Sequence, residues 1–116
     1  MSCSAMEKSD RIKQFEKVLA MDPLDPTTYF GLGQTYFNEG FFTEAEQTLK
    51  RGLELNARHT ASYYLLSQVL NRLGKKEELL VLLKKGIEVG ELEGDRIPTE
   101  KMIAKLHRLT KLTHGL

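Results

Sequence analysis

Two glycines set two positions apart are the first candidate for chemistry. Gly31 and Gly33 have the spacing that begins a glycine-rich loop, in which backbone N–H groups can cradle phosphate. The dinucleotide-binding form of this loop needs a further glycine at position 36, where the chain has Tyr36, and it needs a preceding strand. The sequence therefore favours a structural role for both glycines.

Histidine and cysteine are the next residue types that could hold a metal or act as nucleophiles. His59, His107 and His114 are scattered, and none has a second histidine or a carboxylate at the spacing of a zinc or iron site. His59 falls in a predicted turn, where a surface position is expected. Cys3 is the only cysteine and lies close to the chain end, so we expect no intramolecular disulfide, no cysteine metal site and no thiol catalyst.

Two glutamate pairs could in principle act as an acid and a base. Glu77 and Glu78 are adjacent, and Glu91 and Glu93 are two positions apart. Paired carboxylates acquire different pKa values inside a desolvated cleft, whereas these lie on predicted charged faces or in loops. No serine–histidine–aspartate or cysteine–histidine set is evident. The sequence therefore predicts a non-enzymatic protein with no cofactor and no metal.

A basic segment near the C-terminus could bind a polyanion. Its cations surround an apolar stripe and are Lys101, Lys105, His107, Arg108 and Lys111. Basic amphipathic helices can lie on a membrane or bind nucleic acid. No aromatic residue interleaves these charges, and the stripe is needed to cover the core. We therefore interpret the segment as a capping helix with a basic outer face, and we expect neither a nucleic-acid nor a membrane partner.

Length and composition favour one globular domain, residues 1–116. Hydrophobic residues make up 41% of the chain and charged residues 28%, which places it outside the disordered class. A net charge of +1 creates no overall field that would attract nucleic acid or anionic lipid. The N-terminus lacks the apolar segment of a secretory signal, and the longest apolar run, residues 79–83, is far shorter than the roughly 20 residues of a membrane span. We expect a cytoplasmic protein.

Prolines and capping residues delimit the first predicted helices. Ser9 or Asp10 caps the first helix, and the Asp-Pro-Leu-Asp-Pro segment at 22–26 ends it, because proline disfavours helical geometry in the residue before it. Asp25 caps a second helix that starts at Pro26 and runs to about residue 39. The apolar stripe of the first helix is Ile12, Phe15, Val18 and Leu19.

The next two helices are predicted from their caps and glycine turns. Gly40 makes the turn, and Thr43 with Glu46 forms a capping box that opens the third helix. Its buried side is expected to hold Phe42, Ala45, Leu49, Gly52 and Leu53. Thr60 caps the fourth helix, and Gly74 ends it.

The last two helices differ in character. The fifth is predicted over residues 76–89. The segment 90–95 that follows has glycines at both 90 and 94 and is expected to break the helical pattern. The sixth has Pro98 in its first turn. Its apolar stripe is Met102, Ile103, Leu106 and Leu109. Six helices without strand-like alternation predict an all-α fold.

The chain also matches itself when it is shifted by 34 residues. The matched pairs are Tyr29 with Tyr63, Leu32 with Leu66, Gln34 with Gln68, Gly40 with Gly74, Leu49 with Leu83, and Gly52 with Gly86. Self-similarity at a fixed period of this size is typical of a stacked repeat architecture. Because two repeats rarely bury their own apolar faces, the helices before and after them are expected to cap the stack.

The first repeat resembles the tetratricopeptide repeat, whose pattern is an aromatic, Leu-Gly, an aromatic, a small residue, a large apolar residue and a terminal proline. These places hold Tyr29, Leu32, Gly33, Tyr36, Ala45 and Leu49, with Ala57 in place of the proline. The second repeat departs further, with Ser67 at the glycine place and Leu79 at the alanine place. The resemblance covers about residues 11–90 and implies a right-handed solenoid of helical hairpins.

The resemblance implies a division into repeats and a reason for the small residues. It gives an N-terminal half-repeat at 1–24, repeats at 26–59 and 60–93, and a C-terminal capping helix at 95–114. Gly33, Ala45 and Gly52 are expected where neighbouring helices approach closely. Phe15 and Pro23 have the spacing that the family expects for the end of a preceding repeat.

The family implies a binding site on the concave surface, which the first helix of each repeat lines. Family members generally hold an extended peptide or a partner helix there. The residues on these helices that the core does not need are Thr27, Phe30, Gln34, Phe37, Asn38, Ala61, Tyr64, Gln68, Asn71 and Arg72. Rings could anchor side chains of a peptide and amides could bind its backbone. Phe30 and Phe37 could alternatively pack beneath the first helix and never reach solvent.

Members that bind chaperone tails clamp a terminal carboxylate with lysine and asparagine. The matching places here hold Phe30, Gln34 and Leu65, so a carboxylate clamp is not expected and an apolar or mixed peptide is favoured. Two hypotheses follow. The first is an adaptor that binds a peptide or helix of another protein on its concave face. The second is a self-assembling structural protein whose groove or solenoid end is buried in a homodimer.

Overall fold

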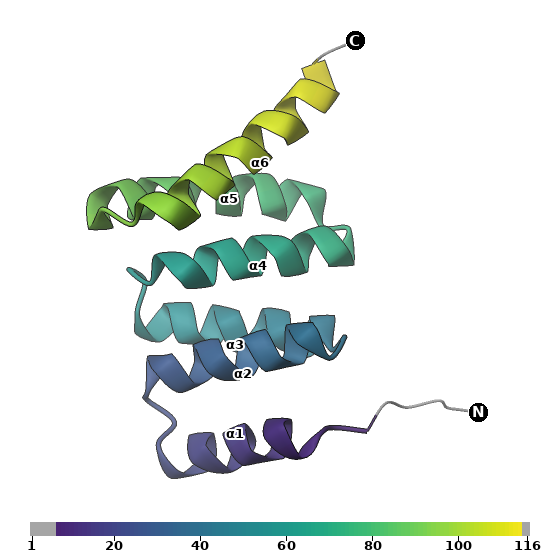
Figure 1. The fold of residues 1–116 in the computed structure, drawn as a ribbon, viewed down its shortest axis with the longest axis vertical. Helices are drawn as coiled ribbons and strands as arrows, with labels where there is room; N and C mark the ends of the chain where they lie inside the picture. Colours follow the sequence, from purple (N-terminus) through teal and green to yellow (C-terminus); the bar gives the residue numbers. More distant parts are fainter. Residues whose placement is uncertain (1–6, 115–116) are drawn as a thin grey trace, which may run out of the picture.

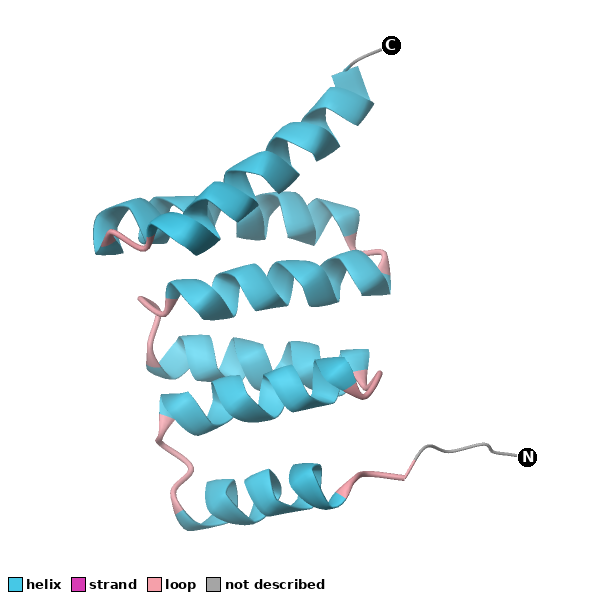
Figure 2. Cartoon of the chain, viewed as in Figure 1, coloured by secondary structure: helices cyan, strands magenta, loops and turns pink. Residues whose placement is uncertain are grey.

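Six α-helices and no strand make up residues 7–114, the part of the chain that the computed structural model describes (Figure 2). Side chains are described up to Lys111, and Cys3 lies outside the described residues. The all-α fold predicted from the sequence is confirmed. The helices are α1 (Asp10–Met21), α2 (Pro26–Asn38), α3 (Phe42–Leu55), α4 (Thr60–Leu73), α5 (Lys76–Glu93) and α6 (Arg96–His114).

The helices stack in chain order and alternate between two layers (Figure 1). Each helix packs against the next one in the chain, while α2 also contacts α4, and α4 also contacts α6. Among the described residues, α1, α3 and α5 make no such contacts with one another. The shortest dimension, 19 Å, corresponds to two helix layers of about 10 Å each. We call α2, α4 and α6 the inner layer and α1, α3 and α5 the outer layer.

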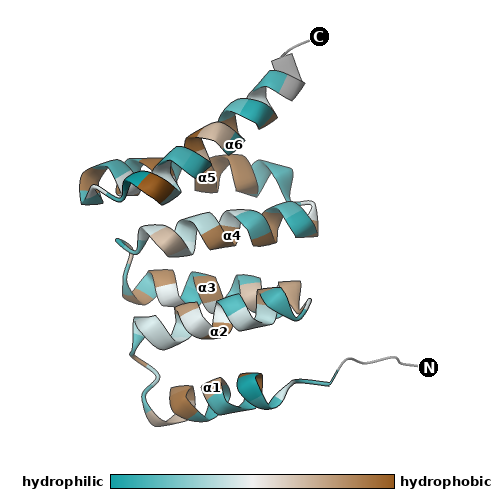
Figure 3. Cartoon of the chain, viewed as in Figure 1, coloured by the Kyte–Doolittle hydropathy of each residue, from teal (hydrophilic) through white to brown (hydrophobic). Residues whose placement is uncertain are grey.

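Each helix carries both hydrophobic and hydrophilic residues, so every helix buries one side and exposes another (Figure 3). The buried apolar side chains form a single cluster that runs through the stack. Its members that are at most 3% exposed are Ile12, Leu32, Ala45, Leu49, Leu66, Val69, Leu70, Leu79, Leu83 and Met102.

Small residues stand where helices meet, as the repeat pattern predicted. A Cβ atom built on Gly33 would lie 2.6 Å from Cδ2 of Leu49, and one built on Gly52 would lie 2.9 Å from Cβ of Tyr29. Ala45 is fully buried. Gly31 and Gly33 both lie inside α2 rather than in a loop, which confirms their structural role.

Two tyrosines hold the turns between repeats through equivalent hydrogen bonds. The Tyr29 hydroxyl donates to the carbonyl oxygen of Pro23 at 2.8 Å, and the Tyr63 hydroxyl donates to the carbonyl oxygen of Ala57 at 2.9 Å. In both cases the acceptor lies six residues before the tyrosine. Each bond ties the start of an inner-layer helix to the preceding turn.

Several predicted helix ends are confirmed. The backbone N–H of Ile12 donates to the Ser9 hydroxyl, and that of Thr27 donates to the Asp25 carboxylate at the start of α2. Gly40 and Gly74 have φ angles of 88° and 73°, the left-handed region that glycine adopts at a helix end.

The predicted caps at Thr43 and Thr60 are wrong. α3 begins earlier than predicted, because the Phe41 carbonyl already accepts from the N–H of Ala45. Phe41 is therefore the N-cap, and its ring provides no side-chain hydrogen bond. His59 precedes α4, and the Thr60 hydroxyl instead donates to Asp95 at 2.7 Å. A long-range partner therefore replaces the local cap at Thr60.

Glu46 does not complete a capping box but accepts hydrogen bonds from two lysines. Nζ of Lys50 lies 2.7 Å from its Oε2, and Nζ of Lys75 lies 2.8 Å from its Oε1. Glu46 is only 4% exposed. Burial raises the pKa of its carboxyl, but the hydrogen bonds from Lys50 and then Lys75 outweigh it and bring the pKa below its ordinary value.

The end of α5 and one residue in each of the predicted apolar stripes of α1 and α6 also differ from the prediction. α5 continues through Gly90 to Glu93 and stops at Gly94, whose φ is 75°. Gly90 is a close-approach position instead of a break, since a Cβ there would collide with Thr99. Val18 and Ile103 are 46% and 44% exposed, because α1 and α6 lie at the ends of the stack, where each has a neighbour on one side.

Candidate functional site

The ten predicted site residues all lie on the inner-layer helices α2 and α4, and none is fully buried. Five of them are exposed: Thr27, Gln34, Asn38, Asn71 and Arg72. The other five are half-buried: Phe30, Phe37, Ala61, Tyr64 and Gln68. The alternative that Phe30 and Phe37 never reach solvent is therefore wrong, although the Phe37 ring does pack on Phe42 with centroids 5.6 Å apart.

Five of these residues meet in one hollow between α4 and α6. The hollow has a volume of about 360 Å³. We call it the basic hollow, and its lining is Phe37, Tyr64, Gln68, Asn71, Arg72, Lys101, Lys105 and Arg108. Thr27, Phe30, Gln34 and Asn38 do not line it. The structure thus brings together the part of the predicted set that lies beside α6.

Rings in the basic hollow lie next to cations. Nζ of Lys101 lies 5.4 Å from the centroid of the Tyr64 ring, and the guanidinium carbon of Arg72 lies 5.7 Å from that of Phe37. Cations at such distances interact favourably with the electron-rich ring face. These contacts hold the charged groups beside the hollow without neutralising them.

The three cations from α6 were missed as site residues. The sequence predicted an outer face for Lys101, Lys105 and Arg108, whereas the structure places them opposite α4 residues across the basic hollow. Burial lowers the pKa of Lys105, and the neighbouring Arg108 lowers it further. The alternation of layers was the available signal, because a sixth helix falls on the same side as the second and fourth.

A second hollow, near the turn between α3 and α4, has a different charge balance. Its volume is about 580 Å³, and it is lined by Asn56, Arg58, His59, Thr60, Ala61, Glu93, Asp95 and Pro98. Here both signs of charge are present: Nε of Arg58 donates to Glu93 at 2.7 Å in an ion pair, and the Asp95 carboxylate accepts from the Thr60 hydroxyl. We call it the polar hollow. Ala61 is the one predicted site residue in it.

Phe30 is fixed beside the polar hollow by the His59 ring. Their ring centroids are 4.9 Å apart in an edge-to-face arrangement. Nδ1 of His59 lies 2.7 Å from the Ser62 hydroxyl oxygen, which orients the imidazole. His59 is therefore half-buried and engaged, and the expectation of an ordinary surface residue is corrected.

The part of the chain that the structure describes contains no group of three or more histidine, cysteine, aspartate or glutamate residues that could hold a metal ion. None of the helices in that part is long and apolar enough to span a membrane. What the inner layer offers is rings, amides and cations on an accessible surface. These groups suit binding of another molecule.

Comparisons with known sequences identify relatives of most of the chain. The family described as "Anaphase-promoting complex, cyclosome, subunit 3" matches residues 8–86. Superkiller protein 3 of Saccharomyces cerevisiae is 32% identical over 79 residues, and Superkiller complex protein 3 of Mus musculus is 26% identical over 105 residues. These alignments cover 68% and 90% of this chain but 6% of each relative, so the chain spans a small part of the relatives' length.

Comparisons with solved structures agree on the fold. The translocator chaperone SycD of Yersinia enterocolitica superposes with a TM-score of 0.84 at 18% identity, over 92% of this chain and 74% of that one. The TPR2B domain of yeast Sti1, in a structure described as a complex with pHsp70, superposes with a TM-score of 0.79 at 11% identity, over 87% of this chain and 81% of that one. The first TPR domain of Spaghetti, bound to an HSP90 peptide, superposes with a TM-score of 0.71 at 23% identity, over 85% of this chain and 76% of that one. At these identities the likeness shows the fold alone.

Proposed function

Because this chain belongs to the tetratricopeptide repeat family, we propose that it binds a segment of a partner protein on the surface of its inner layer. Members of the family generally act as non-enzymatic protein-interaction modules. The observation that carries the proposal is the basic hollow, where side chains of α2, α4 and α6 converge on one accessible concavity. The cytoplasmic location expected from the sequence remains part of the proposal.

The similar structures support binding of a peptide, since one of them is described as a complex with pHsp70 and another as bound to an HSP90 peptide. In this chain the anchors are Phe30 and Tyr64, which occupy equivalent places in α2 and α4 and are both half-buried. Truncating a well-seated aromatic anchor typically costs about 2 kcal/mol or more of binding free energy.

The test is affinity capture with wild-type protein and with the Phe30→Ala/Tyr64→Ala variant as baits. A matched control is Val81→Ala/Leu92→Ala, which shortens two exposed apolar side chains on the outer-layer helix α5. We expect a protein that wild type and the control retain and the aromatic variant loses, with circular dichroism showing all three baits folded. If all three baits retain the same proteins, the inner layer is not the binding surface.

One observation favours self-assembly as a second function. Val18, Met21 and Leu24, in and just after α1, are 46%, 85% and 66% exposed at one end of the stack. A second copy could cover these apolar side chains at that end. Light scattering after size-exclusion chromatography tests this, because a homodimer requires twice the chain mass at micromolar concentration. The Met21→Glu/Leu24→Glu variant should then return the protein to a monomer.

A further inference from the structure

We propose that the basic hollow binds an acidic segment of the partner through the side-chain carboxylates of that segment. The inference rests on the proposed function and specifies the chemistry of the partner at that site. The sequence alone favours an apolar or mixed peptide, and the acidic preference comes from the structure of the hollow.

The charges around the basic hollow are of one sign. Arg72, Lys101, Lys105 and Arg108 line it, and no aspartate or glutamate does. Within the described residues none of these four cations forms an ion pair with a carboxylate, whereas Lys50, Lys75 and Arg58 elsewhere all do. Like charges that face one hollow repel one another, so a bound anion would relieve a repulsion that the free protein carries.

The spacing of the cations favours several carboxylates over one. Lys101 and Arg108 are seven residues apart on α6, which corresponds to about 10 Å along the helix axis. A single terminal carboxylate would contact both only if the two long side chains bent toward each other. An extended peptide places alternate side chains about 7 Å apart on one face, so two or three acidic side chains could match this span.

The surroundings of the hollow favour a peptide over a nucleic acid. A phosphate backbone needs an extended basic surface for strong binding. Here the basic stretch is short, because the polar hollow beside the start of α6 contains Glu93 and Asp95. The net charge of the chain is only +1. An acidic stretch of a few residues fits a basic surface of this length.

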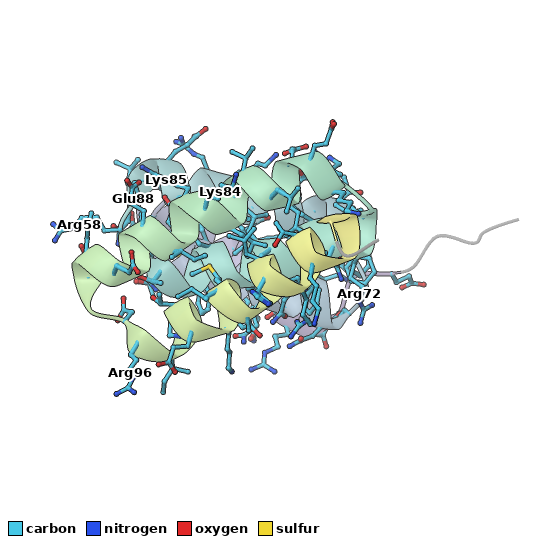
Figure 4. The ribbon with its side chains drawn as sticks, turned by 90° about the horizontal axis from the view of Figure 1, so that it is seen from above. Arg58, Arg72, Lys84, Lys85, Glu88 and Arg96 are labelled. Atoms are coloured by element: carbon cyan, nitrogen blue, oxygen red, sulfur yellow. The ribbon has the colours of Figure 1, made fainter. Side chains whose placement is uncertain are left out.

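The probe is a fluorescein-labelled peptide of four Glu-Ala units with acetylated and amidated ends, so that only its side chains carry charge. Its companion has glutamine in place of every glutamate. The test variant is Lys101→Gln/Lys105→Gln/Arg108→Gln. The control is Lys13→Gln/Lys17→Gln/Lys84→Gln, which removes the same charge from exposed positions on α1 and α5. Figure 4 shows Lys84 on α5 and Arg72 beside the C-terminal half of α6.

We expect polarisation titrations to show the glutamate peptide binding wild type more tightly than the glutamine peptide does. Lys101 and Arg108 are exposed and Lys105 is half-buried. Loss of three charge-assisted contacts from one hollow should weaken binding of the glutamate peptide roughly tenfold, and the control triple should change it by less than about twofold. The test variant should melt close to wild type, because the repulsion that it removes offsets the Lys101–Tyr64 contact that it loses.

Three results would overturn the inference. In the first, the two triple variants weaken binding equally, which indicates a general charge effect. In the second, both peptides bind alike, or the glutamate peptide does not bind. If both peptides bind and the Phe30→Ala/Tyr64→Ala variant loses both, the proposed function stands and only the charge preference is wrong.

In the third result that would overturn the inference, a single-stranded oligonucleotide of equal charge displaces the glutamate peptide and itself binds more tightly.

Discussion

A methyl group at position 33 tests the close contact between α2 and α3. In Gly33→Ala the new Cβ would lie 2.6 Å from Cδ2 and 2.7 Å from Cγ of Leu49. Carbon atoms normally approach to about 3.5–4.0 Å. Because Cγ as well as a terminal methyl is too close, a rotation of the outer methyl groups does not relieve the clash. Leu49 is 1% exposed and has little room to move.

Two opposing effects determine how much Gly33→Ala changes the free energy of unfolding. Alanine is favoured over glycine in a helix interior by about 1 kcal/mol. Overpacking a close-packed core costs about 1–3 kcal/mol, and the displaced Cγ places this site in the upper half of the range. We therefore expect Gly33→Ala to lower the free energy of unfolding by about 1–2 kcal/mol. A methyl in an open position of the same helix would raise it.

A double-mutant cycle isolates the contact. Leu49→Ala alone should cost about 2–5 kcal/mol through the cavity that it leaves. In the double variant the methyl group introduced at position 33 no longer clashes and occupies part of that cavity, so the double variant should be more stable than the sum of the single effects by about 1–3 kcal/mol. Urea unfolding followed by far-UV circular dichroism measures all four free energies. A coupling within about 0.5 kcal/mol of zero would refute the contact.

Two further predictions concern stability. Because the folded-state pKa of Glu46 is lowered, its stabilisation is present above the ordinary carboxyl pKa of about 4.3 and is lost as the pH falls through the folded value. Glu46→Gln should therefore cost about 1 kcal/mol in urea unfolding near neutral pH and nothing once Glu46 is protonated, and a pH-independent cost would contradict this. Removal of residues 95–116 should uncover Gly86 and the α5 side that Met102 seals, and lower the melting temperature or cause association. A truncated chain that melts like the full one and stays monomeric would show that α6 is not a cap.

The repeat and its helix pairs could be predicted because each position in the period has a local physical reason. Gly33 and Gly52 are small where a helix approaches, and Gly40 and Gly74 have the positive φ angles of turns. Gly90 shows where this reasoning fails. A glycine in sequence reads equally as a helix end or as a close contact, and only the position of Thr99 in α6 decides between them.

The candidate site was only half predictable for a related reason. Tyr64 and Arg72 follow from the repeat, since α4 repeats the plan of α2. Lys105 and Arg108 lie in a helix that has left the repeat pattern, so no matched position indicates which way they face. Glu46 is a similar case, because one of its partners, Lys75, is 29 residues away along the chain. Contacts of this kind depend on the assembled stack.

The hydrogen bonds of Tyr29 and Tyr63 to main-chain carbonyls bear on how the turns can change during evolution. A carbonyl oxygen is present at every residue, so the bond depends on the number of intervening residues and not on which side chain stands there. The first acceptor is a proline and the second is an alanine, yet both bonds have nearly the same length. A substitution in these turns should therefore preserve the spacing between repeats. An insertion of one residue would move the acceptor and shift every helix that follows.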